Sequence, residues 1–115
     1  MCAQTETIMV TSKSWDGVDL PDYLVGKPEL RTNRVIVPPH TAMAQHHHPV
    51  MSCAYILKGK LTVVRDNGVE RTFLPGESFA EVVNSSHHGE NRGDEPVEMI
   101  VFLLSQEGQT LQINE

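Results

Sequence analysis

Five of the six histidines of this chain lie in two clusters, His46-His47-His48 and His87-His88. Side chains alternate along an extended strand, so His46 and His48 would share one face while His47 points to the other. Two imidazoles placed in this way can bind one metal ion, and a third ligand would come from the pair His87-His88. Such a site suits one divalent transition metal (Fe, Zn, Mn, Ni or Cu) and leaves positions open for water or substrate. The alternative, a solvated histidine patch, is disfavoured by the apolar segments on either side.

The segments that must position these histidines have the character of short strands. Runs rich in Val, Ile, Leu and Thr alternate with Gly, Pro and Asn-Gly turn signals, and no long helical periodicity is present. This pattern predicts an all-β fold, an antiparallel sandwich or barrel. The run 97–104 is almost entirely apolar, so we expect it to be buried on both faces. The expected strands are 19–25, 30–37, 41–48, 51–57, 61–65, 69–74, 78–83, one that begins near 87, 97–104 and 110–114.

The composition limits the classes of function that the chain can have. A chain of 115 residues with 39% hydrophobic and 21% charged residues predicts one globular domain, with residues 1–29 as a lead-in that packs on a barrel of residues 30–115. A net charge of −6 without a basic cluster argues against nucleic acid and anionic membrane as partners. No apolar segment approaches a membrane span and no signal-peptide pattern is present, so a cytoplasmic location is expected.

The spacing around the first histidine cluster resembles a known motif. The first motif of the cupin superfamily is Gly, five residues, His-x-His, three or four residues, Glu, six residues and Gly. His46, His48 and Gly59 match it in this chain. Two positions depart from the motif: His40 stands at the first glycine, and Ser52 stands at the glutamate, which is often the fourth ligand. The resemblance therefore implies three histidine ligands and no carboxylate from position 52.

The spacing around the second cluster resembles the second cupin motif, which is Gly, five residues, Pro-x-Gly, two residues, His, three residues and Asn. Gly76, His87 and Asn91 match it, and His87 is selected over its neighbour. Val82 and Asn84 replace the proline and the second glycine, and Asn84 can adopt the left-handed backbone of such a turn. The resemblance covers residues 30–104. It implies a small single-domain RmlC-like cupin with an antiparallel double-stranded β-helix (jelly-roll) barrel, and a homodimer.

The resemblance leaves several functions open. Three neutral imidazoles leave a divalent ion its full charge, which favours an anionic ligand or a more acidic bound water. The ligand set is also similar to that of the cupin thiol dioxygenases. We therefore expect a metal-dependent, dioxygenase-like oxidoreductase that acts on an unidentified small-molecule ligand. The alternatives are a non-catalytic protein that binds metal or a small ligand, and a non-redox isomerase or decarboxylase.

Four further residues are candidates for the site. Glu81 interrupts an apolar run six residues before His87, and it could orient a ligand histidine or act as a general base. The alternative for Glu81 is a solvated side chain or a pairing with an arginine. Ser52 and Tyr55 could line the cavity, although core packing is the default for the tyrosine. Arg34 could clamp a carboxylate substrate, and an exposed arginine is the competing interpretation.

Overall fold

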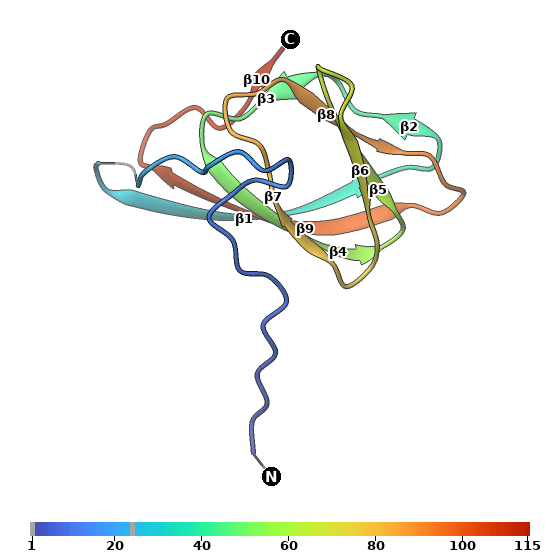
Figure 1. Ribbon diagram of the computed structural model, residues 1–115, viewed down its shortest axis with the longest axis horizontal. Helices are drawn as coiled ribbons and strands as arrows, with labels where there is room; N and C mark the ends of the chain where they lie inside the picture. Colours follow the sequence, from blue (N-terminus) through green and yellow to red (C-terminus); the bar gives the residue numbers. More distant parts are fainter. Residues whose placement is uncertain (1, 24) are drawn as a thin grey trace.

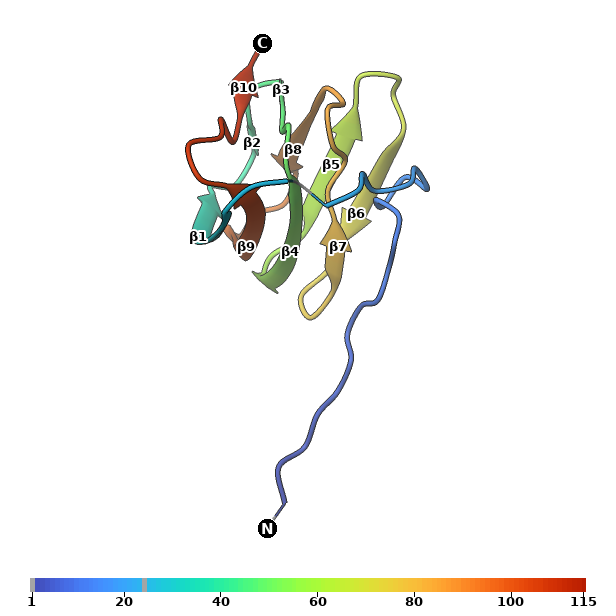
Figure 2. The same cartoon turned by 90° about the vertical axis from the view of Figure 1, so that its left-hand side faces the viewer.

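The computed structural model describes residues 2–23 and 25–115, which form two antiparallel sheets around a common interior (Figures 1 and 2). The described residues contain no helix, so the all-β jelly-roll prediction is confirmed. One sheet has the order β1 (Pro28–Val37), β9 (Val97–Gln106), β4 (Met51–Lys58) and β7 (Ser78–Ala80). The other has the order β10 (Ile113–Asn114), β3 (His46–His47), β8 (His87–Asn91), β5 (Leu61–Arg65) and β6 (Glu70–Phe73), with β2 (Thr41–Ala42) also paired to β8.

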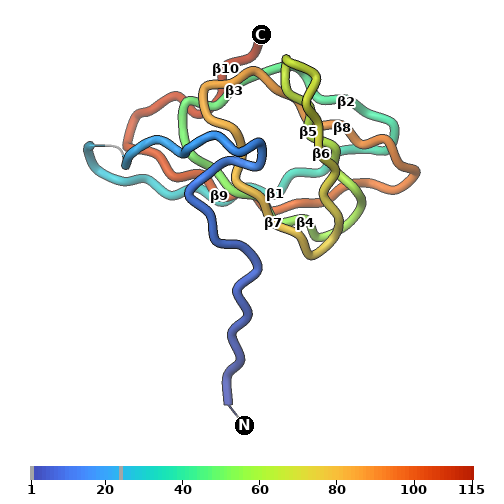
Figure 3. The backbone as a smooth tube through the Cα atoms, in the orientation of Figure 1, coloured from blue at the N-terminus to red at the C-terminus, as the bar shows by residue number. Residues whose placement is uncertain are grey.

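Alternating apolar side chains fill the space between the two sheets. Ile56 on β4 and Val97 on β9 are fully buried, and β5 contributes Leu61 and Val63. Each such side chain stabilises the fold by about 1.5–3 kcal/mol relative to an exposed position. Figure 3 shows the chain winding around this interior, while the N-terminal segment leads away from it. Core side chains such as Leu61 and Val63 also line a cavity that lies between the two sheets beside the histidines.

The register of the first sheet decides which side chains reach the interior. β1 pairs with β9 from Pro28↔Gln106 to Val37↔Val97, and β4 pairs with the other edge of β9. The expectation that 97–104 is buried on both faces is wrong, because Phe102 is 48% exposed. The outer face of this sheet is only partly covered, so alternate residues of β9 remain in contact with solvent.

Four other expected strands differ clearly from the observed ones, and of these the one expected at 110–114 is reduced to β10. The strand expected at 41–48 is divided into β2 and β3, so residues 43–45 lie outside the ladder. In place of a strand at 19–25, the described residues form only an isolated bridge between Lys13 and Asp19, and residue 24 lies outside the described residues. β7 ends at Ala80 instead of 83, which places Glu81 directly after the strand.

The described residues include no helix long and apolar enough to cross a membrane.

The turn between β4 and β5 depends on Gly59, which has a φ of +76°. A Cβ atom there would lie 2.5 Å from the carbonyl oxygen of Pro96, a backbone atom that cannot move away freely. Gly68, in the hairpin between β5 and β6, has a φ of +85° but nothing within 4 Å of the same added atom. The two glycines therefore separate the cost of backbone strain from the cost of steric overlap.

We expect Gly59→Ala to lower the free energy of unfolding by about 2–4 kcal/mol, because left-handed strain and a backbone clash add. Gly68→Ala is the matched control and should cost only about 1 kcal/mol, since it adds strain alone. Urea unfolding of both variants measures the difference. Equal losses would contradict the close approach of the Gly59 turn to Pro96.

Candidate metal centre

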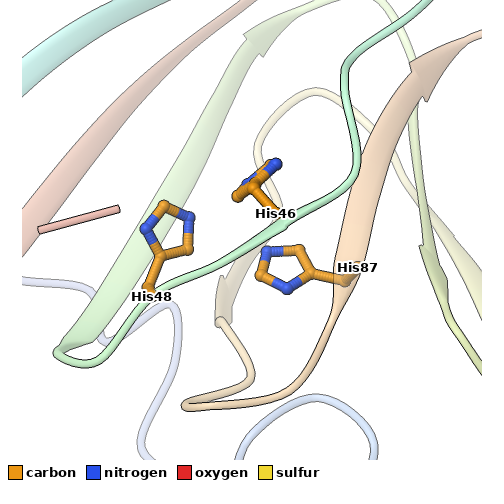
Figure 4. Close-up of side chains that lie close together, drawn as sticks. All are labelled: His46, His48 and His87. Carbon is orange, nitrogen blue, oxygen red and sulfur yellow. The ribbon is translucent and has the colours of Figure 1, made fainter. Parts of the chain in front are cut away.

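The pairing of β3 with β8 brings the two histidine clusters together. His46 lies opposite His87 in the register of these strands, and His48 follows directly after β3. One ring nitrogen from each of the three histidines lies within 4.8 Å of the others. The ring centroids are 4.6 to 5.3 Å apart, and Figure 4 shows the three rings side by side. The structure thus unites the three histidines that the two motifs select.

The other two clustered histidines face away from this centre. His47 Nδ1 lies 2.5 Å from a carboxylate oxygen of Glu115 at the C-terminal end. His88 contacts Gln45 through Nδ1 and Glu90 through Nε2, each at 2.7 Å. Alternation along the strands explains both placements. Both histidines have polar partners of their own outside the triad.

Backbone carbonyl groups determine the tautomer of each ring in the triad. A carbonyl oxygen can only accept, so each Nδ1 in contact with one carries the proton and each Nε2 keeps its lone pair. Metal-binding histidines are commonly oriented by such a bond from the other ring nitrogen. The three bonds run from His46 to Ala44 at 2.7 Å, from His48 to Leu111 at 3.0 Å and from His87 to Ser85 at 2.8 Å.

His87 provides the clearest sign that the triad is built for an ion. Its side chain is almost completely buried, and within the described residues Nε2 has no hydrogen-bond partner. Leaving such a group unsatisfied costs about 1–3 kcal/mol. A divalent transition metal would satisfy the lone pair of Nε2 together with those of His46 and His48. The residues present therefore fit this group.

The triad opens into a cavity of about 160 Å³ between the two sheets. Its walls are mainly apolar, and no Lys or Arg occurs among the described residues that line it. An anionic ligand would therefore find no cationic side chain in the cavity. Besides the triad, the polar lining groups are Asn33, Ser52, Glu81 and Gln112.

Glu81 is the one carboxylate among the described lining residues, and its two oxygens have different surroundings. Oε1 accepts hydrogen bonds from the indole N–H of Trp15 at 2.9 Å and from the backbone N–H of Val82 at 3.0 Å. Oε2 lies 3.6 Å from Nε2 of His87. Burial raises the pKa of Glu81, and the two hydrogen bonds oppose this shift. Glu81 is therefore neither a solvated side chain nor the partner of an arginine.

The contact between Trp15 and Glu81 is a feature that spacing in the sequence does not reveal. The two residues are 66 positions apart, and Trp15 belongs to the segment before β1. The Trp15 ring also packs edge-on against Phe73, and its backbone N–H donates to the carbonyl of Ala80. A tryptophan near the N-terminus is a weak signal, because only the folded chain brings it to β7.

The remaining candidates divide between the two faces of their strands. Ser52 lines the cavity beside Glu81, whose backbone N–H donates to the Ser52 carbonyl at 3.0 Å. The expectation that Arg34 and Tyr55 line the cavity is corrected, because both point to the opposite face from the lining residues of their strands. Arg34 is mostly exposed there and forms an ion pair with Glu98.

The protein interior favours the neutral form of two rings of the triad, His87 and His48. Burial lowers the pKa of His87 from 6.5 to about 4, with a smaller contribution from His46. Burial also lowers the pKa of His48, and the neighbouring rings add to this effect. Neutral imidazole is the form that binds a metal ion.

A family model described as Cupin domain matches residues 33–103, which is more than half of the chain. The matched region begins in β1, ends in β9 and contains the whole triad. No curated protein matches the chain.

Several solved structures share the fold. The DMSP lyase DddQ from Ruegeria pomeroyi is 20% identical over 74% of this chain and 42% of its own, with a TM-score of 0.64. An oxalate oxidase in complex with the substrate analogue glycolate is 24% identical over 74% of this chain and 45% of its own, with a TM-score of 0.63. The Bacillus subtilis oxalate decarboxylase, with Mn(II) centres, is 24% identical over 74% of this chain and 23% of its own, with a TM-score of 0.59. The chain spans less than half the length of each.

In the metal-free protein, we expect the His87 ring to stay neutral until about pH 4, whereas the unfolded chain gains this proton near pH 6.5. Between these values the unfolded state binds more protons, so the His87 contribution to stability is complete above pH 6.5 and is lost as the pH falls toward 4. The loss amounts to about 3 kcal/mol. Ring nitrogen chemical shifts followed by NMR measure the titration.

The control for this titration is His87→Asn, for which the free energy of unfolding should depend less steeply on pH in the same interval. A His87 ring that titrates near pH 6.5 would contradict the burial effect.

Proposed function

This chain belongs to the cupin domain family, and from that premise we propose that it binds one divalent transition metal through His46, His48 and His87 and acts with it on a small molecule. The observation that carries the proposal is the buried Nε2 of His87, which has no hydrogen-bond partner in the described part of the chain. The three Nδ1–carbonyl bonds support it, because they present all three lone pairs at once.

The cavity favours a ligand of only a few non-hydrogen atoms. Its volume of about 160 Å³ corresponds to roughly five water molecules in the liquid. Its walls lack Lys and Arg among the described residues, so an anionic group would bind to the ion itself. Among the similar folds, the two oxalate enzymes act on a small acid, and one holds Mn(II). We therefore propose a small carboxylic acid as the class of substrate.

The reaction that we propose first is a dioxygenase-like oxidation. When bound, a redox-active ion would supply electron exchange and Lewis acidity. The protein would supply neutral imidazoles, apolar walls and Glu81, which we propose as the catalytic residue because its Oε2 lies 3.6 Å from Nε2 of His87. A non-redox decarboxylase or isomerase is the second candidate. It is favoured by the position of Glu81, because its Oε2, 3.6 Å from Nε2 of His87, faces the cavity in which a ligand of the ion would lie.

A homodimer and a cytoplasmic location stay predictions. The outer face of the β1-β9-β4-β7 sheet supports the first, because Leu30, Ile36 and Phe102 are all exposed on it.

Protein purified without chelators or nickel resin should contain one divalent transition metal per chain. Alanine at His46, His48 or His87 should lower metal occupancy severely, because each removal leaves only two imidazoles. The matched control is His47→Ala, since this ring lies in the same run but contacts Glu115 outside the triad. Elemental analysis by mass spectrometry measures occupancy. Full occupancy in His87→Ala would contradict the proposed site.

Iron-loaded protein should consume oxygen in the presence of one or more small carboxylic acids, if the reaction is an oxidation. An oxygen electrode measures the uptake, and His87→Ala loaded under the same conditions is the control. Turnover of an acid without oxygen uptake would contradict the oxidation and favour the non-redox candidate.

A further inference from the structure

We propose that Glu81 is the fourth protein ligand of the ion, so that three neutral imidazoles and one carboxylate hold it. The inference rests on the proposed metal site and extends it, because a triad alone would leave the ion without an anionic protein donor. It follows from the place of Glu81 in the sheet, from the surroundings of its two oxygens and from its lack of a countercharge.

The pairing of β7 with β4 places the Glu81 side chain beside the triad. β7 pairs with β4 at Cys53↔Ala80. One position further along, the backbone N–H of Glu81 donates to the carbonyl of Ser52 at 3.0 Å. Ser52 and Glu81 therefore enter the cavity side by side. Position 52 carries a hydroxyl group, which is a poor ligand, while position 81 carries a carboxylate. The carboxylate that β4 lacks at position 52 is thus provided by Glu81, directly after β7.

One distance, that between Glu81 and His87, agrees with a shared coordination sphere. Two ligands bonded at 2.0–2.2 Å to a tetrahedral ion lie about 3.4 Å apart. Oε2 of Glu81 lies 3.6 Å from Nε2 of His87, a separation too long for a hydrogen bond but close to that value. Oε1 is held by Trp15 and Val82, so the carboxylate is anchored through one oxygen and presents the other to the triad.

The charge balance also points to an ion beside Glu81. A buried carboxylate requires an opposite charge or several hydrogen bonds. No Lys or Arg in the described chain forms an ion pair with Glu81, and its contacts on Oε1 are neutral donors. A divalent ion held by the triad would supply the missing positive charge. With one carboxylate bound, the centre would keep a net charge of +1, enough to bind one further anionic group.

Cobalt(II) binding to the full-length, metal-free chain tests the inference without any enzymatic activity. Glu81→Gln keeps the size of the side chain and an oxygen for Trp15 but removes the charge. We expect it to weaken Co(II) binding by about 10–100-fold in competition with a chelator, and to change the visible d–d absorption. Glu98→Gln is the matched control, because it removes one negative charge from the outer face, where Glu98 pairs with Arg34.

A rescue experiment makes the test more specific. Glutamate introduced at position 52 of the Glu81→Gln variant (Ser52→Glu) should restore Co(II) affinity, since the two positions lie side by side in the cavity. A second measurement needs no variant. The infrared difference spectrum of the wild-type chain on Zn(II) binding should show one carboxylate that becomes coordinated, and its absence would overturn the proposal even if Glu81→Gln failed to fold.

The outcomes separate this inference from the proposed function. If Glu81→Gln binds Co(II) with unchanged affinity and spectrum while His87→Ala does not bind it, Glu81 is not a ligand and the triad stands alone. If His87→Ala binds Co(II) like the wild type, the metal site itself is wrong. Loss of affinity in Glu81→Gln and in Glu98→Gln alike would reduce the effect to general charge and would also overturn the proposal.

Discussion

The orientation of three imidazole rings by three backbone carbonyl groups is the constraint on which the centre depends. His46 and His87 each bond to the carbonyl two residues earlier, so the residues directly before β3 and β8 orient these rings. His48 instead bonds to Leu111, which arrives from the segment before β10. β10 pairs with β3, and this pairing holds the C-terminal segment against the histidine run. Because each carbonyl accepts the Nδ1 proton, all three Nε2 lone pairs are directed away from the backbone.

Burial shifts the pKa values of several titratable groups in this centre. Burial among the apolar walls of the cavity lowers the pKa of His87 and His48 and raises that of Glu81. Each shift has desolvation as its largest cause, so the cavity disfavours every isolated charge within it. A metal ion changes this balance, because imidazole nitrogens and a carboxylate oxygen can satisfy it directly. The cavity therefore combines an apolar lining with three imidazole rings whose lone pairs a metal ion would satisfy.

The N-terminal segment takes part in the centre even though it lies outside the two sheets. Trp15 donates to Glu81, packs against Phe73 and bonds to the backbone of Ala80. Phe73 in turn stacks on Phe79 with ring centroids 4.0 Å apart. The lead-in is thus connected to the core and to the carboxylate by the same residue. A change in the packing of this segment would reach Glu81 through one hydrogen bond.

The amino-acid sequence by itself determined the all-β class, most of the strands and the candidate metal-binding histidines. Glycine and Asn-Gly turns divide short apolar runs, and this local pattern predicted nearly all of the strands and the all-β fold. Alternation within a strand placed His46 and His48 together and His47 apart, because the period of two is a local property of extended backbone. The motif spacings selected His87 for the same centre. These inferences needed only residue types, their separations along the chain and, for His87, the resemblance to the cupin motifs.

Tertiary structure alone decided the surroundings of Glu81, its contact with Trp15 and the placement of Arg34 and Tyr55. The sequence left Glu81 open between a solvated side chain and a site residue, since nothing local says where β7 ends or which strand lies beside it. The pairing of β7 with β4 answers both points and brings Glu81 to Ser52. Arg34 and Tyr55 point outward because the register of β1, β9 and β4 assigns the interior to their neighbours. Strand pairing joins residues that are far apart in the chain, so its results cannot be read from local spacing.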